Sequence, residues 1–147
     1  MIALFWSLMR ISFLSLLFAA IYLHSCAGAP ARKELQSFID EFQREVGVDA
    51  SGVSVYFDKL DPEIAGVCIL GIKIVRIDEQ TYRSLSFIEQ KALIYHELAH
   101  CACNLYGHAA VVPRHCQDSL MAPRMQSRYC YDKYWKKYIK DLKKRCK

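Results

Sequence analysis

The residues best suited to chemistry lie in the stretch HELAHCACNLYGH, which runs from His96 to His108. Its first five letters form the pattern His-Glu-x-x-His. On a helix, side chains four positions apart lie on the same face, so His96 and His100 can converge on one metal ion. Glu97 would then be placed to take a proton from an attacking water. The stretch therefore predicts a zinc site with a carboxylate base beside it.

A methionine segment, SLMAP at 119–123, lies downstream of these histidines. With it, roughly residues 53–125 resemble the metzincins, zinc peptidases whose HExxH helix is followed by a tight turn containing methionine beneath the metal. The segment more closely resembles a group of small bacterial metallopeptidases in which a cysteine-bearing strand precedes the helix. The resemblance implies a zincin-like α+β fold in which His96 and His100 bind zinc, Glu97 is the general base and Met121 is the Met-turn residue.

The third metal ligand is where the chain departs from the metzincin pattern. HExxHxxGxxH would require a glycine at position 103 and a histidine at position 106, where this chain has Cys103 and Tyr106. The next histidine is His108, and we expect it to be the third ligand. His115 and a carboxylate such as Asp118 remain alternatives.

Two residues allow His108 to take that role. Asn104 is the residue after glycine that best tolerates the left-handed conformation ending a helix, and Gly107 gives the chain freedom directly before the histidine. A helix one residue longer than the family pattern, followed by a slightly wider turn, would bring His108 back to the metal.

Residues 1–25 have the order of an export signal. Arg10 precedes an uncharged apolar run at 11–23, and small residues follow it. The run is shorter than the about 20 residues that span a bilayer. LHSC at 23–26 resembles the lipobox of bacterial lipoproteins, which implies a lipid on Cys26 and a membrane-anchored protein of the periplasm or cell envelope; plain secretion is the alternative. Residues 26–147 are then the zincin-like domain.

The cysteines favour disulfides. Of seven, Cys26 would carry lipid or leave with the signal, and an even number remains for an oxidising compartment. Cys101 and Cys103 lie about 200° apart around a helix and cannot pair with each other. Cys68 is expected to pair with Cys101, because its strand should lie beside the helix. The alternative is a structural zinc site formed among Cys101, Cys103, His108, His115 and Cys116.

Periodicity places the motifs on a few elements. We expect a helix at 33–46, strands at 53–57 and 66–78, a helix from Ser86, a loop over 104–129 and a final helix at 131–144. Ser86 and Glu89 form a capping box at the start of the metal-binding helix. The order predicts an α+β domain with a small mixed sheet, an active-site helix, a Met-turn loop and a C-terminal helix.

The strand at 66–78 contains Gly71, which is able to break or bulge it. In its second half, Ile72, Ile74 and Ile77 are expected to share one face, opposite Lys73, Val75 and Arg76. In zincins the sheet edge that lines the cleft binds the peptide as an added strand. The resemblance implies this role for residues 72–77.

Positive charge is concentrated at the end of the chain. The net charge is +5, and residues 132–147 hold eight basic and two acidic side chains. The aromatic side of the final helix should pack on the core, which makes the basic side a solvated face, with anionic lipid or an acidic partner as a secondary role. Nucleic acid is not an expected partner of an exported protein, and we expect a monomer.

The expected function is that of a zinc metalloendopeptidase, which hydrolyses peptide bonds of a peptide or protein substrate with one zinc ion per chain. Tyr95, Tyr106 and Tyr129 are candidates for stabilising an oxyanion, and nothing in the sequence selects among them. One alternative is an exported zinc-binding protein without catalysis. Another is a disulfide-stapled interaction protein in which the HExxH pattern is incidental.

Overall fold

The first helix, α2 (Lys33–Val46), has the bounds that the sequence predicts. The computed structural model describes residues 33–147, so the export signal and Cys26 lie outside the described residues. Gly47, which has a φ of 82°, ends the helix in the left-handed region. Every apolar position of its expected stripe is buried: Leu35, Phe38, Ile39, Phe42 and Val46. The stripe packs α2 against the rest of the core.

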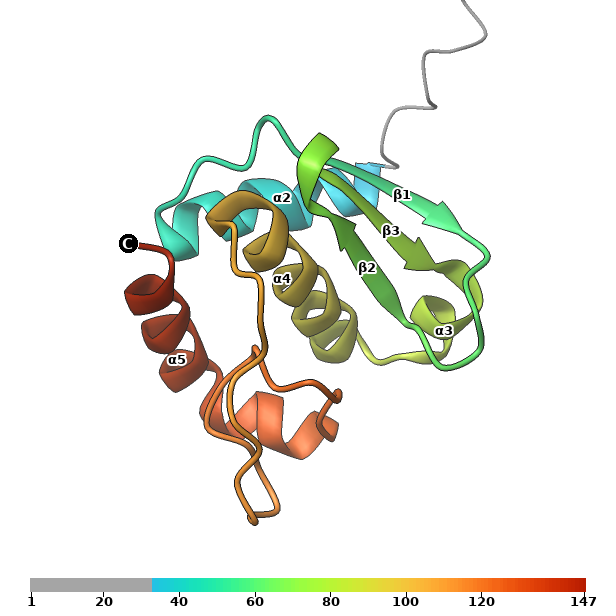
Figure 1. Ribbon diagram of the computed structural model, residues 1–147. Coiled ribbons are helices and arrows are strands. Elements are labelled where there is room, and N and C mark those ends of the chain that lie inside the picture. The colour runs from blue at the N-terminus through green and yellow to red at the C-terminus, as the bar shows by residue number, and fades with distance from the viewer. Residues whose placement is uncertain (1–32) are drawn as a thin grey trace, which may run out of the picture. The chain divides into compact units, whose positions relative to one another are not determined.

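The central helix is α4 (Phe87–Cys103), and its capping box is present as expected. The Ser86 backbone N–H donates to the Glu89 carboxylate at 3.0 Å. Figure 1 shows α4 running between the sheet and the C-terminal helix. Because it is surrounded in this way, α4 is buried along most of its length, including the polar residues Lys91 and Glu97. Lys91 donates to Glu41 and Glu45 of α2, at 2.8 and 3.1 Å.

The sheet has three strands, β1 (Ser54–Asp58), β2 (Gly66–Ile69) and β3 (Ile74–Asp78), in the order β1-β3-β2. β1 is parallel to β3, whereas β2 is antiparallel to it. The expected strand at 66–78 is therefore broken close to Gly71, as that residue allowed, and forms two strands instead of one. The chain forms a short 3-10 helix at Leu70–Ile72 and passes through Lys73, with a φ of 51°, so that its two halves pair as a hairpin.

The expected faces of β3 are wrong. Val75 and Ile77 are fully buried, while Ile74 is half-buried and Ile72, in the 3-10 turn, is 63% exposed. The side-chain period of two holds, but the hairpin turn shifts which residues face the core. Val75 and Ile77 therefore face the core, and Arg76 points outward, where it pairs with Asp58 at 2.7 Å.

A short helix without a counterpart among the expected elements, α3 (Glu79–Ser84), follows β3. Asp78 caps it, accepting a hydrogen bond from the Thr81 backbone N–H at 2.8 Å. Its one buried residue, Tyr82, packs edge-on against Phe57 of β1. Six residues are too few to show a helical period, which is why the pattern gave no signal.

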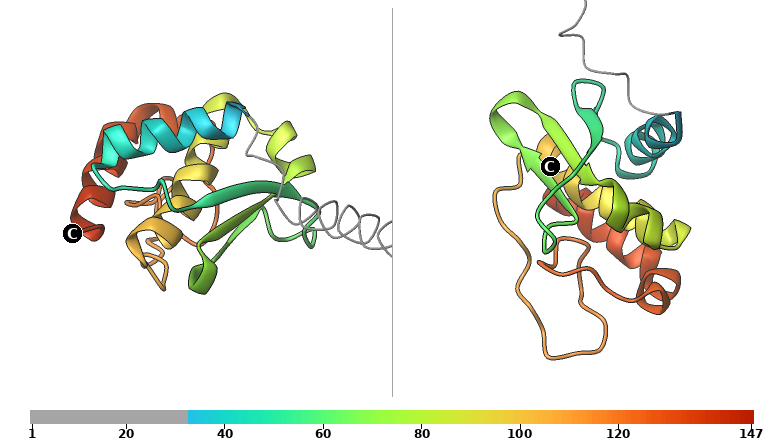
Figure 2. Two further views of the ribbon diagram at one scale, coloured as in Figure 1. Left: turned by 90° about the horizontal axis from the view of Figure 1, so that it is seen from above. Right: turned by 90° about the vertical axis from the view of Figure 1, so that its right-hand side faces the viewer.

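The C-terminal helix, α5 (Arg128–Arg145), packs its aromatic side on the domain as expected. Tyr131, Tyr138 and Leu142 are buried. The two views of Figure 2 show α5 and α2 flanking α4 on the side away from the sheet hairpin. The described residues thus form a mixed α+β domain with a small mixed sheet and four helices.

All six cysteines of the described region form disulfides: Cys68–Cys101, Cys103–Cys146 and Cys116–Cys130. The expected pairing of Cys68 with Cys101 is confirmed, and it fastens β2 to α4. Three disulfides indicate an oxidising, exported environment. Over residues 33–147, no helix combines the length and apolar character that crossing a bilayer requires.

Candidate metal centre and cleft

The imidazoles of His96 and His100 are held in defined orientations by backbone carbonyls. The Nδ1 atom of His96 lies 2.7 Å from the Leu120 carbonyl oxygen, and that of His100 lies 2.5 Å from the Leu105 carbonyl oxygen. A carbonyl oxygen only accepts, so each Nδ1 must carry the hydrogen and donate it. A neutral imidazole has one N–H, and both Nε2 atoms are therefore left with a lone pair.

Those two lone pairs face each other. The Nε2 atoms are 3.1 Å apart, and burial lowers the pKa of His96 to about 4. Two neutral nitrogens at this distance repel each other unless a cation lies between them, and the lowered pKa disfavours a proton in that position. Tetrahedral zinc with Zn–N bonds of about 2.0–2.1 Å would separate two ligand nitrogens by about 3.3 Å. The two histidines therefore fit a first-row divalent metal. Imidazole ligands suit zinc, and they also suit copper, iron and nickel.

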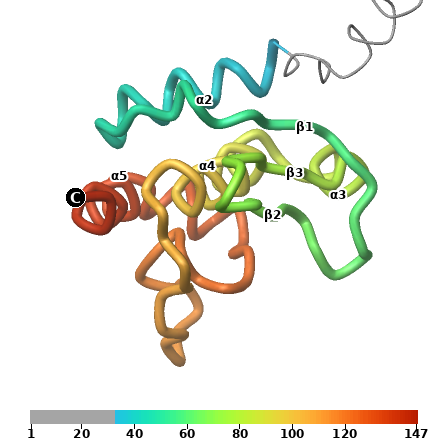
Figure 3. The backbone as a smooth tube through the Cα atoms, turned by 45° about the horizontal axis from the view of Figure 1, so that its top comes forward, coloured from blue at the N-terminus to red at the C-terminus, as the bar shows by residue number. Residues whose placement is uncertain are grey.

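His108 is the third histidine of this cluster. Its ring centroid is 5.1 Å from the centroids of both His96 and His100, and the ligand nitrogens of the three lie within 4.8 Å of one another. Asn104 ends α4 in the left-handed region, with φ 54° and ψ 41°, as the sequence suggests. The chain then turns and returns past the end of α4, as the tube in Figure 3 shows.

The structure does not bring the two alternative third ligands to this cluster. His115 is exposed and lies beside Tyr129, with ring centroids 6.1 Å apart. Asp118 pairs with Lys137 at 2.5 Å. His108 is thus the donor that the geometry favours.

The SLMAP segment holds two of the three histidines in place. The Leu120 carbonyl accepts from His96, and the Met121 carbonyl accepts from the backbone N–H of Ala109, at 2.6 Å, directly after His108. Met121 itself is fully buried. A backbone carbonyl on the second nitrogen of a metal-binding histidine is the common way to fix its orientation.

The same segment is tied to α5. The Ser119 hydroxyl donates to the Asp141 carboxylate at 2.5 Å and accepts from the backbone N–H of Met121 at 3.0 Å. Asp141 also pairs with Arg145 at 2.8 Å. The aromatic helix therefore does more than cover the core, since it fixes the turn that orients His96.

Glu97 lies next to the cluster in a tightly packed position. It is 5% exposed, and burial raises the pKa of its carboxyl to about 7, opposed by a hydrogen bond from the Cys68 backbone. Gly66 of β2 lies directly against it: a Cβ at Gly66 would be 2.9 Å from the Glu97 Cγ and 3.1 Å from its Oε1. Only the absence of a side chain at Gly66 lets β2 approach the carboxylate so closely.

A cleft of about 460 Å³ opens beside His96, Glu97 and His108. Residues 62–66 and residues 122–125 are among those that line it. The expected peptide-binding role of residues 72–77 is therefore misplaced, because β3 is the central strand and both its edges are paired. β2 is one of the two edge strands, and it begins at Gly66 in the wall of the cleft.

None of the three tyrosines considered from the sequence lines this cleft. Tyr95 is fully buried and its hydroxyl donates to Glu45 at 3.3 Å, whereas Tyr106 and Tyr129 are 83% and 55% exposed. Tyr131, which the sequence assigned to the core face, does line the cleft. Its hydroxyl accepts from the Gln126 backbone N–H at 2.9 Å.

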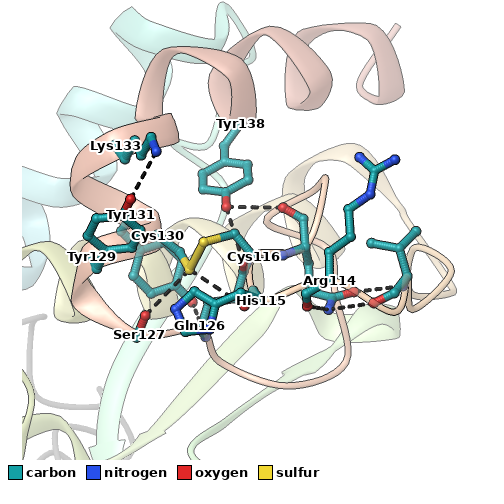
Figure 4. Close-up of a disulfide and its surroundings, with 12 residues drawn as sticks. Arg114, His115, Cys116, Gln126, Ser127, Tyr129, Cys130, Tyr131, Lys133 and Tyr138 are labelled. Atoms are coloured by element: carbon teal, nitrogen blue, oxygen red, sulfur yellow. Dashed lines mark hydrogen bonds between the residues drawn. A yellow bond between two sulfur atoms is a disulfide. The ribbon is translucent and has the colours of Figure 1, made fainter.

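A second group of candidate metal donors, His115, Cys116 and Cys130, lies apart from the cleft histidines. Its two sulfurs form a disulfide, which leaves one histidine and no thiolate. Figure 4 shows this bridge joining the loop to the first turn of α5. Since Cys101 and Cys103 are bridged as well, the expected alternative of a cysteine-containing zinc site finds no free sulfur in the described residues.

No protein-family model matches the sequence, and no curated protein or solved structure matches it. The function must therefore be inferred from the residues and their geometry.

Proposed function

We propose that this chain is a zinc-dependent metalloendopeptidase with a zincin-like fold of the metzincin type. The observation that carries the proposal is the pair of facing Nε2 atoms of His96 and His100, 3.1 Å apart, each with its other nitrogen bound to a carbonyl. His108 would complete a set of three imidazoles, and Met121 would be the Met-turn residue. A zinc ion held there would polarise a scissile carbonyl and lower the pKa of a water to about 7.

Glu97 supports hydrolysis over simple metal storage. Its carboxyl lies in the wall of an open cleft, and burial raises its pKa to about 7, where a group both takes and returns protons at neutral pH. We assign it the general base that takes the proton of the attacking water and passes it to the leaving amine. The three histidines would hold the zinc ion, and the buried surroundings of Glu97 would exclude competing water.

β2 is proposed to receive the substrate. Among the described strands its outer edge has no partner, and Gly66 and the residues before it line the cleft. An extended peptide could bind there as an added antiparallel or parallel strand, through backbone hydrogen bonds that require no particular side chains. Main-chain binding of this kind suits an unfolded protein or a flexible peptide as substrate.

The test compares zinc content and hydrolysis of a labelled, unfolded protein. Glu97→Ala should keep one zinc per chain and lose roughly 10²- to 10⁴-fold in hydrolysis, because it removes proton transfer and leaves the three histidines intact. In the same assays His108→Ala should lose zinc, whereas the matched change His115→Ala should lose neither zinc nor activity.

Unchanged hydrolysis by Glu97→Ala would refute the general-base role. Tight binding of one zinc without turnover on any peptide would instead identify an exported zinc-binding protein without catalysis.

A further inference from the structure

The solvent side of α5 carries a row of lysines, here called the lysine row: Lys133, Lys136, Lys137, Lys140, Lys143 and Lys144. At 100° per residue these six positions fall within a sector of roughly 120° and extend over about 16 Å. All six are exposed. Tyr129 falls in the same sector and is 55% exposed, so one aromatic ring stands at the start of the row.

The lysine row points away from the domain. Three of the four buried residues of α5, Tyr131, Tyr138 and Leu142, lie about half a turn around the helix from the centre of the row. Lys133 donates to the Tyr129 hydroxyl at 2.9 Å, as Figure 4 shows, and the two side chains form one surface.

Carboxylates leave most of this charge unpaired. In the described part of the chain, only Lys137 of the row forms an ion pair, with Asp118. The two acidic residues of α5 are engaged elsewhere: Asp132 pairs with Arg128, and Asp141 pairs with Arg145. The row therefore presents five charges that no carboxylate of the domain offsets.

The row is not explained by the stability of α5. Like charges three and four positions apart on a helix repel each other. The helix dipole favours cations only in the last turn, which accounts for Lys143 and Lys144 but not for the row before them. Disulfides at Cys130 and Cys146 fix both ends of α5, so the repelling lysines stay aligned.

We propose that the lysine row, with Tyr129, binds the anionic surface of a lipid bilayer. A rigid row of flexible ammonium groups matches a planar array of phosphates better than it matches a single ligand, and polybasic helical surfaces of this size bind anionic lipid. An exposed tyrosine beside the row suits the boundary between headgroups and acyl chains.

The chain outside the described residues favours the same partner. Six residues lie between Cys26 and Lys33, and the seven residue-to-residue steps of this segment reach at most about 25 Å. A lipid on Cys26 would hold the domain within that distance of a bilayer. One acyl chain alone gives marginal binding, and a basic surface is the usual second contribution. This inference is independent of the proposed hydrolase activity.

The test uses the exported chain with Cys26→Ser, so that no lipid is attached, and phosphatidylcholine vesicles with or without phosphatidylglycerol. One variant carries Lys136→Gln, Lys140→Gln and Lys143→Gln. The matched control, Lys33→Gln, Lys59→Gln and Lys73→Gln, removes the same charge from exposed sites outside the row. Co-sedimentation measures binding, and unfolding curves verify that both variants fold.

Binding only to vesicles with phosphatidylglycerol is expected, with a roughly hundredfold loss in the row variant, since each lysine contributes about fivefold. The control variant should bind nearly as well as the parent chain. An equal loss of vesicle binding in both variants would mean that binding depends on net charge alone, and it would overturn the proposal. So would binding to a soluble polyanion or acidic protein without binding to vesicles.

Discussion

At the residue scale, the candidate metal site depends on hydrogen bonds made by the imidazole nitrogens that would not bind the metal. Two backbone carbonyls, of Leu120 and Leu105, fix the hydrogen on the Nδ1 atoms of His96 and His100. The lone pairs on the two Nε2 atoms therefore point toward the same position before any ion binds. Such preorganisation lowers the entropy that binding costs, because the imidazole rings are already oriented.

Substitution of Gly66 tests the proposed base, Glu97, separately from the proposed metal ligands. We predict that Gly66→Ala keeps its zinc but loses hydrolysis, because the new Cβ would meet the Glu97 Cγ at 2.9 Å and the Ile77 Cδ1 at 3.0 Å. Relieving that overlap should also cost about 1–3 kcal/mol of unfolding free energy. The measurements are zinc content, hydrolysis rate and denaturant unfolding.

The control is Gly71→Ala, because no heavy atom lies within 4 Å of a Cβ at Gly71. It should leave all three quantities close to those of the parent chain. If Gly66→Ala behaved like Gly71→Ala, the close packing of β2 on Glu97 would have no role in the activity.

At the element scale, α2, α4 and α5 could be predicted from the sequence, whereas the short helix α3 and the pairing of β2 with β3 could not. The bounds of α2 and the capping box of α4 follow from local patterns that tertiary contacts did not override. The turn between β2 and β3 uses Lys73 in a left-handed conformation rather than the Asn-Gly or Gly-Gly pairs that mark hairpins. Gly71 indicates that the run at 66–78 can break, but no local pattern specifies that its two halves pair as a hairpin.

The candidate site, like the fold, could be predicted only where its residues belong to a local pattern. HExxH spacing singles out His96, Glu97 and His100, and Asn104 explains how a longer helix still returns the chain to His108. Gly66 and Tyr131 were not recognisable as cleft residues, because their place depends on how β2 and α5 pack on α4. Contacts between distant segments leave no local pattern.

The Cys68–Cys101 disulfide joins two elements of the cleft, β2 and α4. We predict that replacing both cysteines with alanine lowers the unfolding free energy by about 3–4 kcal/mol, the entropy of a closed loop with a sequence separation of 33. Hydrolysis should fall as well, because the backbone of residue 68 forms a hydrogen bond with Glu97 and the disulfide holds that backbone in place. Denaturant unfolding and rate measurements test both effects.

The comparison variant replaces Cys116 and Cys130, whose separation of 14 closes a shorter loop away from Glu97. It should cost about 3 kcal/mol and leave the base in place. Equal losses of activity in the two variants, measured at a temperature where both remain folded, would contradict a specific role of the first bridge.

At the scale of the whole molecule, four tyrosines share the interior: Tyr82, Tyr95, Tyr131 and Tyr138. Burial raises the pKa of each phenol, that of Tyr131 to about 12. An unfolded chain releases these protons near pH 10, whereas the folded chain retains them at that pH. Between pH 10 and 12 the folded state therefore binds more protons, and its stability must fall as the pH rises.

We predict nearly constant stability from pH 7 to 9, as far as the tyrosines contribute, and a progressive loss above pH 10. Tyr131 alone should account for a loss of about 2–3 kcal/mol by pH 12. Tyr131→Phe should reduce the slope of stability against pH above pH 10, although it lowers stability at pH 8 by removing the bond from Gln126. An unchanged slope in this variant would rule out the retained proton on Tyr131.

The connectivity of the disulfides has a consequence for how the protein is made. The Cys68–Cys101 bridge joins neighbours in order of synthesis, but Cys116–Cys130 lies nested inside Cys103–Cys146. A chain threaded out of the cell from its N-terminus and oxidised as it emerges would join Cys103 to Cys116, because Cys146 arrives last. Correct maturation of the second half therefore needs an isomerase in the receiving compartment, or a delay in oxidation until the final helix has docked.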